Sequence, residues 1–228
     1  MNTLKINIAG ENAVIIYFSD KPSSEIAGKL LVAQHTIREY CQAMIIDLVP
    51  SYTSILVIFD LFYCDHFQLI SRLRQCLAHI PNSEKTRSKV IKLPVYYGID
   101  GAPDLIALSR RAQLSVEEVV NIHQNQEYRV YAIGFAPGFA YLGDVDERIS
   151  TPRLNTPRLK VPRGSVAIAD RQTAVYPNVS PGGWHLIGLC PTKMFDLNTE
   201  PNMPVNVGDR VKFYAVNKKE FMVLGGSV

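Results

Sequence analysis

Apolar residues follow two different spacings along the first 85 residues. Apolar and polar residues alternate over 4–8, and a turn at 10–12 leads into the apolar run 13–19. This pattern predicts two strands joined as a hairpin. Beyond Pro22 the apolar residues recur at the spacing of a helix with one buried face. These helical positions are Ile26, Leu30, Ala33 and Ile37.

Two further strands and a second helix follow in the sequence. The short apolar segments 43–49 and 54–60 read as strands, and Asp65 with Gln68 three residues later forms a capping-box pattern for a helix. The apolar positions of this helix are Phe67, Ile70, Leu73, Leu77 and Ile80. Strands, helix, strands and helix in this order predict a ferredoxin-like α/β sandwich, whose final strand would be 90–97.

The polar segment 81–89 is the natural domain boundary. We therefore expect an N-terminal ferredoxin-like α/β domain over 1–85 and a second domain over 90–228. The second domain starts with the strand 90–97 and a short helix that opens at Pro103-Asp104.

A second helix of this domain has a capping-box pattern at Ser115 and Glu118, and His123 lies on its apolar stripe. Burial there would lower the pKa of His123 and keep its imidazole neutral. The remaining strand candidates are 164–169, 173–177, 184–189 and 209–216. Short strands separated by glycine turns favour a barrel or rolled sheet, so the predicted fold class is α+β.

Composition excludes several classes of protein. The chain has 228 residues, 47% of them hydrophobic, with no run of about 20 apolar residues and no basic, apolar start typical of a secretory signal. We expect a soluble protein of the cytoplasm. The net charge of +3 is too small to indicate binding to nucleic acid or to a membrane. The four cysteines are widely separated, which argues against a zinc site or other metal centre and against a disulfide framework.

The stretch 134–191 concentrates the residues that restrict or specify backbone shape. It contains seven of the 14 prolines and seven of the 14 glycines, so its path is irregular but defined. Between Arg148 and Arg171 six basic residues stand against the single acid Asp170. This charge suits a carboxylate, a phosphate or an acidic partner, and it also fits a solvated basic face.

No familiar phosphate-binding or hydrolase motif occurs in the chain. G-x-G-x-x-G, the P-loop, G-x-S-x-G and H-E-x-x-H are all absent. If ATP is used, a standard glycine loop of this chain does not hold its phosphates.

Three segments instead carry a resemblance to a known family. They read IKLPVYYGIDGAPDL at 91–105, EYRVYAIGFAPGFAYLG at 127–143 and TPRLNTPRLKVPRGSVAIADRQTAVYPNVSPGGWHLIG at 151–188. With these spaced proline, glycine and aromatic positions the chain resembles the KipI family, the group of the B-type subunit of 5-oxoprolinase (PxpB) and allophanate hydrolase subunit 1. The match is dense from about Lys92 to Phe213.

The resemblance implies a small N-terminal α/β domain and a C-terminal cyclophilin-like β-barrel. It also implies a C-type partner of homologous fold (KipA/PxpC-like) and a separate A-type partner (PxpA-like). Together these would form an ATP-dependent 5-oxoprolinase that opens 5-oxoproline to L-glutamate. Two alternatives belong to the same family: a KipI-like regulator that inhibits a sensor histidine kinase, and a urea- or allophanate-type amide-metabolism subunit.

The chemistry of this reaction suggests roles for particular residues. Opening an unstrained lactam requires an activated carbonyl, and charge that develops on oxygen must meet preorganised donors. Arg153 and Arg158, each after a proline, would bind a carboxylate or phosphate, and His123 would move a proton. Gln172 would hydrogen-bond the amide, with Arg163 and Tyr141 also binding substrate.

Aromatic residues of the same stretch suit contact with a partner. The predicted partner interface comprises Phe135, Pro137, Phe139 and Trp184. Structural alternatives remain for all of these residues: the arginines could brace loops, Gln172 could hold a strand end, His123 could be a core residue, and the aromatic rings could form the barrel wall.

The chain departs from the family pattern at four positions. Ala140 replaces a usual proline, Arg163 replaces a small residue, and Asp170 and Ala174 stand where glycine is common. The last two could restrict the backbone or narrow a pocket beside Gln172. We expect the segment 134–188 to form one wall of a shared site whose opposite wall belongs to another chain.

Overall fold

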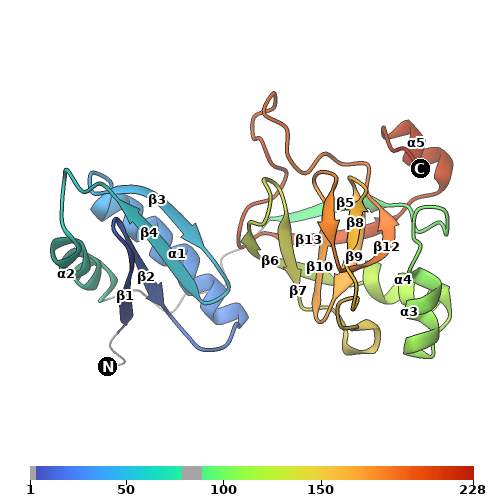
Figure 1. Ribbon diagram of the computed structural model, residues 1–228, viewed down its shortest axis with the longest axis horizontal. Coiled ribbons are helices and arrows are strands. Elements are labelled where there is room, and N and C mark those ends of the chain that lie inside the picture. Colours follow the sequence, from blue (N-terminus) through green and yellow to red (C-terminus); the bar gives the residue numbers. More distant parts are fainter. Residues whose placement is uncertain (1–3, 79–88) are drawn as a thin grey trace. The chain divides into compact units, whose positions relative to one another are not determined.

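The computed structural model describes residues 4–78 and 89–228 (Figure 1). The chain divides into two compact units, Met1–Arg87 and Ser88–Val228, and each has its own hydrophobic core. Among the helices of these described residues, none has both the length and the apolar character needed to cross a membrane.

The N-terminal unit is a four-stranded antiparallel sheet packed against two helices. The strands are β1 (Lys5–Gly10), β2 (Ala13–Tyr17), β3 (Ile45–Pro50) and β4 (Ser54–Phe59), in the order β1-β2-β4-β3. The helices are α1 (Ser24–Cys41) and α2 (His66–Leu77). The predicted opening hairpin is β1 paired with β2.

Both helices begin at the residues that the sequence indicated. The Ser23 side chain accepts a hydrogen bond from the N–H of Ile26 (3.2 Å), and Asp65 and Gln68 form a reciprocal capping box. The buried face of α2 agrees with the prediction at Leu73 and Leu77 and differs from it at Leu69. It consists of Leu69, Leu73 and Leu77, spaced four residues apart.

Phe67 was predicted to be buried on α2 but is 81% exposed. Successive residues of a helix are rotated by about 100°, so Phe67 points well away from the Leu69 face. Ile80, predicted on the same face, lies outside the described residues.

The strand 90–97 does not complete the N-terminal sheet. The structure places β5 (Val90–Val95) in the second unit, where it pairs in parallel with β13 (Arg210–Ala215). Leu93 and Val95 are buried in the core of that unit. The prediction of a final ferredoxin-like strand from this segment is therefore wrong, and the first hairpin provides two strands of the four-stranded sheet instead.

The second unit is built on a curled seven-stranded sheet (Figure 1). Its order is β12-β9-β10-β7-β6-β13-β5. The remaining strands of this sheet are β6 (Glu127–Ile133), β7 (Ala140–Gly143), β9 (Ser165–Ala169), β10 (Gln172–Val175) and β12 (His185–Leu189). Just past the end of edge strand β5, Tyr96 exchanges two backbone hydrogen bonds of 2.8 and 2.9 Å with Leu189 of the other edge strand. The sheet therefore curls until its two edges meet at one end, as the predicted rolled sheet requires.

Helices and a small additional sheet complete this unit. The helices are α3 (Leu105–Ala112), α4 (Val116–Gln124), the 3-10 helix η1 (Glu147–Ile149) and α5 (Lys218–Val223). The additional sheet pairs β8 (Arg158–Val161) with β11 (Ser180–Gly182). The predicted Ser115–Glu118 capping box starts α4. The sequence indicated neither α5 nor the β8–β11 pair.

Candidate functional site

The strands β9 and β10 separate two groups of buried side chains. Successive residues of a strand point to opposite faces. On one face Val166, Ile168 and Val175 belong to the main core of the unit. On the other face Ala167, Ala169 and Ala174 meet four aromatic rings, which we call the aromatic cluster: Phe139, Tyr141, Tyr176 and Trp184. The small alanine side chains leave room for these rings.

The rings of the aromatic cluster pack edge to face around Phe139. Its ring centroid lies 4.9 Å from Tyr141, 5.2 Å from Tyr176 and 5.6 Å from Trp184, all T-shaped. This is a favourable arrangement of aromatic quadrupoles. Tyr141 is only partly buried, so the cluster has an accessible edge.

The turn before β7 positions Phe139 within this cluster. Phe135 and Gly138 both have positive φ, +70° and +84°. A Cβ on Gly138 would lie 2.5 Å from the carbonyl oxygen of Met194, so glycine is required there. The turn buries Phe139 and leaves Phe135 64% exposed. Pro137 is exposed as well.

Arg153 lies over the indole of Trp184 at the edge of the cluster. Its guanidinium carbon is 5.7 Å from the ring centroid, within range of a cation–π interaction. Arg153 is exposed, and no hydrogen bond or ion pair joins its side chain to the described residues. Its charge is therefore available to an anion.

The backbone around Arg153 is fastened on both sides. We call 150–154 the strap. Four hydrogen bonds fix it: Ser150 Oγ to Asp170 O (2.8 Å), Asp170 N to Thr151 O (2.6 Å), His185 Nε2 with Pro152 O (3.0 Å), and Leu154 N to Gly183 O (2.7 Å). Arg153 is thus an exposed cation on a fixed backbone, which favours preorganised binding.

Arg158 has a different environment from Arg153. Its Nη2 donates to Asp104 Oδ1 at 2.6 Å, and its Nη1 lies 3.5 Å from the carbonyl oxygen of Trp184. The other Asp104 oxygen accepts from the N–H of Leu186 at 2.7 Å. This geometry corresponds to the bracing alternative for Arg158, because its charge is already paired.

His123 lies in the main core and not with the aromatic cluster. Its side chain is fully buried, with Nδ1 2.7 Å from the Tyr97 hydroxyl and Nε2 3.0 Å from Thr173 Oγ1. Burial lowers the pKa of His123 to about 3, so the ring is neutral at physiological pH. Thr173 and its neighbour Gln172 point to opposite faces of β10. The structure therefore does not bring His123 together with Gln172.

The predicted substrate-binding residues lie at different ends of the cluster. Gln172 is half-buried where β10 pairs with Ala169 of β9, and Tyr141 lies on the neighbouring strand β7. Arg163 is exposed two residues before β9 begins, and Ala169 lies at the opposite end of this strand, about 13 Å from its start. Arg163 is thus separated from Gln172.

The four predicted interface residues divide into two pairs. Phe135 and Pro137 are exposed and available to a partner. Phe139 and Trp184 are only 2% and 4% exposed, because their rings fill the aromatic cluster of this chain. They pack in the interior of this unit instead of lying at its surface.

Two of the departures from the family pattern have a visible geometry. Asp170 has φ +49°, a left-handed conformation that favours glycine and is tolerated by aspartate. Ala174 is completely buried beneath the aromatic cluster. Asp170 lies in the two-residue loop between β9 and β10, beside the strap.

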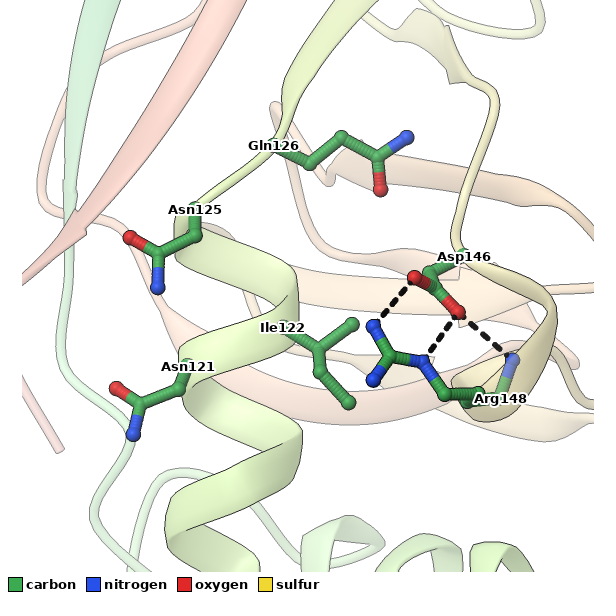
Figure 2. A pocket seen from close by; sticks show the side chains of 6 residues that line it. All are labelled: Asn121, Ile122, Asn125, Gln126, Asp146 and Arg148. Atoms are coloured by element: carbon green, nitrogen blue, oxygen red, sulfur yellow. Dashed lines mark hydrogen bonds and ion pairs between the residues drawn. The ribbon is translucent and has the colours of Figure 1, made fainter.

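A cavity beside α4 is formed by a different set of residues (Figure 2). It has a volume of about 370 Å³ and is lined by Asn121, Ile122, Asn125, Gln126, Asp146 and Arg148. The Asp146 carboxylate accepts both the guanidinium and the backbone N–H of Arg148, which lowers the pKa of Asp146 to about 2. The charges therefore satisfy each other, and no predicted site residue lines this cavity.

The described residues provide no metal centre of the usual kind. Within 4–78 and 89–228, no group of three or more His, Cys, Asp or Glu side chains could hold a metal ion. The aromatic cluster with Arg153, Tyr141 and Gln172 at its edge is consequently the best candidate site. It offers a cation and polar groups to a small molecule that carries both a negative charge and an amide. The described residues that form it do not include a histidine or carboxylate to act as general acid or base for catalysis.

Sequence reasoning missed Asp104 and the strap. Asp104 was interpreted only as the start of a helix, and its partners lie 54 and 82 residues away. The only local signal was the Thr-Pro-Arg-Leu repeat, which places a proline before both Arg153 and Arg158.

Comparison with known proteins gives the family. The model of the carboxyltransferase domain, subdomain C and D, matches residues 4–205. The chain is 36% identical over 227 residues to the B-type subunit of 5-oxoprolinase from Bacillus subtilis (strain 168), covering 95% of both chains. It is 34% identical over 213 residues to the protein of that name from Escherichia coli O157:H7, covering 93% of this chain and 96% of the relative.

Solved structures share the architecture. The crystal structure of TTHA0988 is 32% identical with a TM-score of 0.80, and the match covers 90% of this chain but only 40% of that one. The urea amidolyase of Kluyveromyces lactis is 20% identical with a TM-score of 0.78, covering 96% of this chain and 15% of that one, and shows a common fold alone. The family resemblance predicted from the three sequence segments is confirmed: the chain belongs to the carboxyltransferase domain, subdomain C and D, family.

Proposed function

We propose that the chain is the B-type subunit of an ATP-dependent 5-oxoprolinase. The observation that carries this proposal is the identity of 34% and 36% to two proteins that bear this subunit's name, over more than nine-tenths of each chain. The complex would convert 5-oxoproline, ATP and two waters to L-glutamate, ADP and phosphate. A cytoplasmic location, where ATP is available, fits this reaction.

The candidate site has chemistry that suits this substrate. 5-Oxoproline carries one carboxylate and one lactam amide. Arg153 presents an exposed cation over Trp184, which would bind the carboxylate, and Gln172 and Tyr141 carry hydrogen-bonding groups that suit the amide. A carboxylate is bound more tightly by a donor that is held in place before binding, and the fastened strap favours this at Arg153.

The reaction also needs groups that this chain does not bring together. His123 is enclosed in the main core, and Arg158 is paired with Asp104. The ATP site and the missing catalytic groups would therefore come from the KipA-like C-type partner and from the A-type partner. Phe135 and Pro137, exposed beside the aromatic cluster, would contact one of these partners.

The test is reconstitution with the two partner proteins. The chain alone should be inactive, and mixing it with the A-type and C-type partners should give ADP and glutamate in amounts that depend on 5-oxoproline. Arg153→Gln should lower kcat/KM by about 10- to 100-fold, as expected for loss of one charge-assisted contact. Lys160→Gln removes an equal charge from an exposed position of the same basic segment and should change kcat/KM less than about 2-fold.

The alternatives give different results in the same assays. ATP hydrolysis that depends on urea and not on 5-oxoproline would favour the alternative of a urea- or allophanate-type amide-metabolism subunit. Inactive mixtures, combined with reduced autophosphorylation of a sensor histidine kinase, would favour the KipI-like regulator. Equal effects of Arg153→Gln and Lys160→Gln would remove Arg153 from the site.

A further inference from the structure

Asp104 occupies the N-cap position of α3 but does not cap that helix. Aspartate at this position usually accepts a hydrogen bond from the first turn of its own helix. Here the backbone of Asp104 has φ −102° and ψ −5°, and its side chain makes no capping bond. Asp104 is 9% exposed, and its carboxylate binds residues outside the helix that it begins.

Both oxygens of this carboxylate instead bind other parts of the unit. Oδ1 accepts from Arg158 Nη2 of β8 at 2.6 Å, and Oδ2 accepts from the N–H of Leu186 in β12 at 2.7 Å. Charge-assisted bonds of this length are the strong ones in proteins. A buried carboxylate with both oxygens used in this way fixes its partners in position.

Arg158 also contacts the backbone of Trp184. Its Nη1 lies 3.5 Å from the carbonyl oxygen of Trp184, two residues before Leu186. The Asp104–Arg158 ion pair therefore holds the backbone on both sides of His185. One contact is at the Trp184 carbonyl and the other is at the Leu186 N–H.

The orientation of Trp184 determines what lies beneath Arg153. The Arg153 guanidinium carbon is 5.7 Å from the indole centroid. The strap holds the Arg153 backbone at Asp170 and Gly183, outside the Trp184–Leu186 segment, as well as at His185 within it. A rotation of the Trp184–Leu186 segment would break the His185–Pro152 bond and move the ring, while the bonds of the strap to Asp170 and Gly183 remained. Arg153 would then lose its cation–π contact with the indole.

We propose that Asp104, through Arg158, is a positioning residue that orients the Trp184 indole beneath Arg153 and so sets the anion-binding geometry of the site. Its effect on catalysis rests on the proposed function, whereas its effect on Trp184 does not. The ligand class is a small carboxylate such as that of 5-oxoproline. Asp104 touches no substrate in this scheme.

Trp184 is the only tryptophan of the chain, so its fluorescence reports directly on this geometry. The variants are Asp104→Asn, Asp104→Ala and Arg158→Lys. Asparagine keeps an acceptor for the Leu186 N–H but removes the charge, and lysine keeps the charge but lacks the planar fork that reaches both Asp104 and the Trp184 carbonyl. All three should shift the emission maximum and change iodide quenching, with Asp104→Ala giving the largest change.

Kinetics of the complex reconstituted with both partner proteins provide the second readout. Loss of a binding contact used equally in the ground state and the transition state raises KM and leaves kcat unchanged. Asp104→Asn and Arg158→Lys should raise the KM for 5-oxoproline about 10-fold while kcat changes less than about 2-fold. Glu127→Gln, which breaks the exposed pair with Arg210 (3.0 Å) in the same unit, is the matched control and should alter neither readout.

The outcomes separate the two proposals. Unchanged Trp184 emission in folded Asp104→Asn and Arg158→Lys proteins would overturn the positioning role. A fall in kcat at constant KM would also overturn it, because the pair would then act in the chemical step. If the emission shifts as expected but the wild-type complex shows no 5-oxoproline-dependent ATP hydrolysis, the proposed function fails and the orientation of Trp184 by Asp104 stands.

Discussion

The two faces of β10 use their polar side chains in opposite ways. On the main-core face, Thr173 binds His123, whose two ring nitrogens both have partners within the chain. On the other face, Gln172 is half-buried at the edge of the aromatic cluster, and Arg153 is exposed above Trp184. Neighbouring residues of one strand thus contribute to a sealed core and to an accessible site.

This difference separates structural from functional polar groups. A buried histidine with two internal hydrogen bonds stabilises the fold and has no capacity left for a ligand. A cation that is fixed by its backbone but lacks an ionic partner keeps that capacity. Solvent access and the charge of Arg153, which has no ionic partner among the described residues, therefore identify the candidate site more than residue type does.

Removal of His123 should have the largest effect on stability. His123→Ala leaves a cavity beside Phe213, whose ring stacks on His123 at 4.7 Å, and deprives Tyr97 and Thr173 of their partner. We expect the free energy of unfolding to fall by about 3–5 kcal/mol. Urea unfolding followed by circular dichroism measures this loss.

Activity of the same variant sharpens the contrast between the faces. If His123 is structural, the folded fraction of His123→Ala in the reconstituted complex should keep a kcat within about 3-fold of wild type. A kcat reduced by 100-fold or more in folded protein would return His123 to a catalytic role. Arg153→Gln is the mirror-image control, because it should lose activity while its unfolding midpoint stays constant.

Acidification should lower the free energy of unfolding through His123, by somewhat less than the His123→Ala substitution does. The pKa of His123 falls from 6.5 to about 3 through burial, so between these values the unfolded chain binds the extra proton and the folded chain does not. Stability from this group is complete above pH 6.5 and is lost as the pH falls toward 3. The neighbours Tyr97, Thr173, Tyr128 and Phe213 carry no charge in this window.

The expected loss between pH 6.5 and pH 5 is about 2 kcal/mol, since one pKa unit corresponds to about 1.4 kcal/mol. The measurement is the urea midpoint at a series of pH values. His123→Gln has no titrating group at this position and should show a flatter profile over the same range. Parallel profiles for the two proteins would contradict the assignment.

Local patterns predicted the elements better than their partners. The caps at Ser23, Asp65 and Ser115 were predictable because each depends on residues within one turn. The strand 90–97 was visible, but its partner lies more than 100 residues later at β13. Period and capping chemistry do not determine which of two sheets a strand joins.

The candidate site was predictable by region and not by role. The density of proline, glycine and arginine identified 134–188. The distinction between Arg153 and Arg158 depends on Asp104, which is 54 residues from Arg158 and occupies an apparent helix cap. Two identical Thr-Pro-Arg-Leu repeats therefore place one arginine at the surface and the other in an ion pair.

The smallest expected effect concerns Asp170, in the loop that joins β9 to β10. Asp170 has φ +49°, and its backbone N–H and carbonyl both hold the strap, at Thr151 O (2.6 Å) and Ser150 Oγ (2.8 Å). Asp170→Gly removes the strain of a left-handed conformation, which stabilises the folded protein. It also increases the conformational entropy of the unfolded chain, which lowers stability. These terms oppose each other, so the free energy of unfolding should change by at most about 0.5 kcal/mol.

Asp170→Ala, which cannot adopt this conformation easily, is the control and should destabilise by about 1 kcal/mol. Because the exposed Asp170 side chain makes no bond to the strap, the KM of the Asp170→Gly complex for 5-oxoproline should stay within about 2-fold of wild type. A much lower KM would mean that the carboxylate of Asp170 repels the substrate or narrows its path to Gln172. Substrate access to the accessible face would then be limited by the aspartate at this position, in addition to the geometry that the strap and the Asp104–Arg158 pair impose.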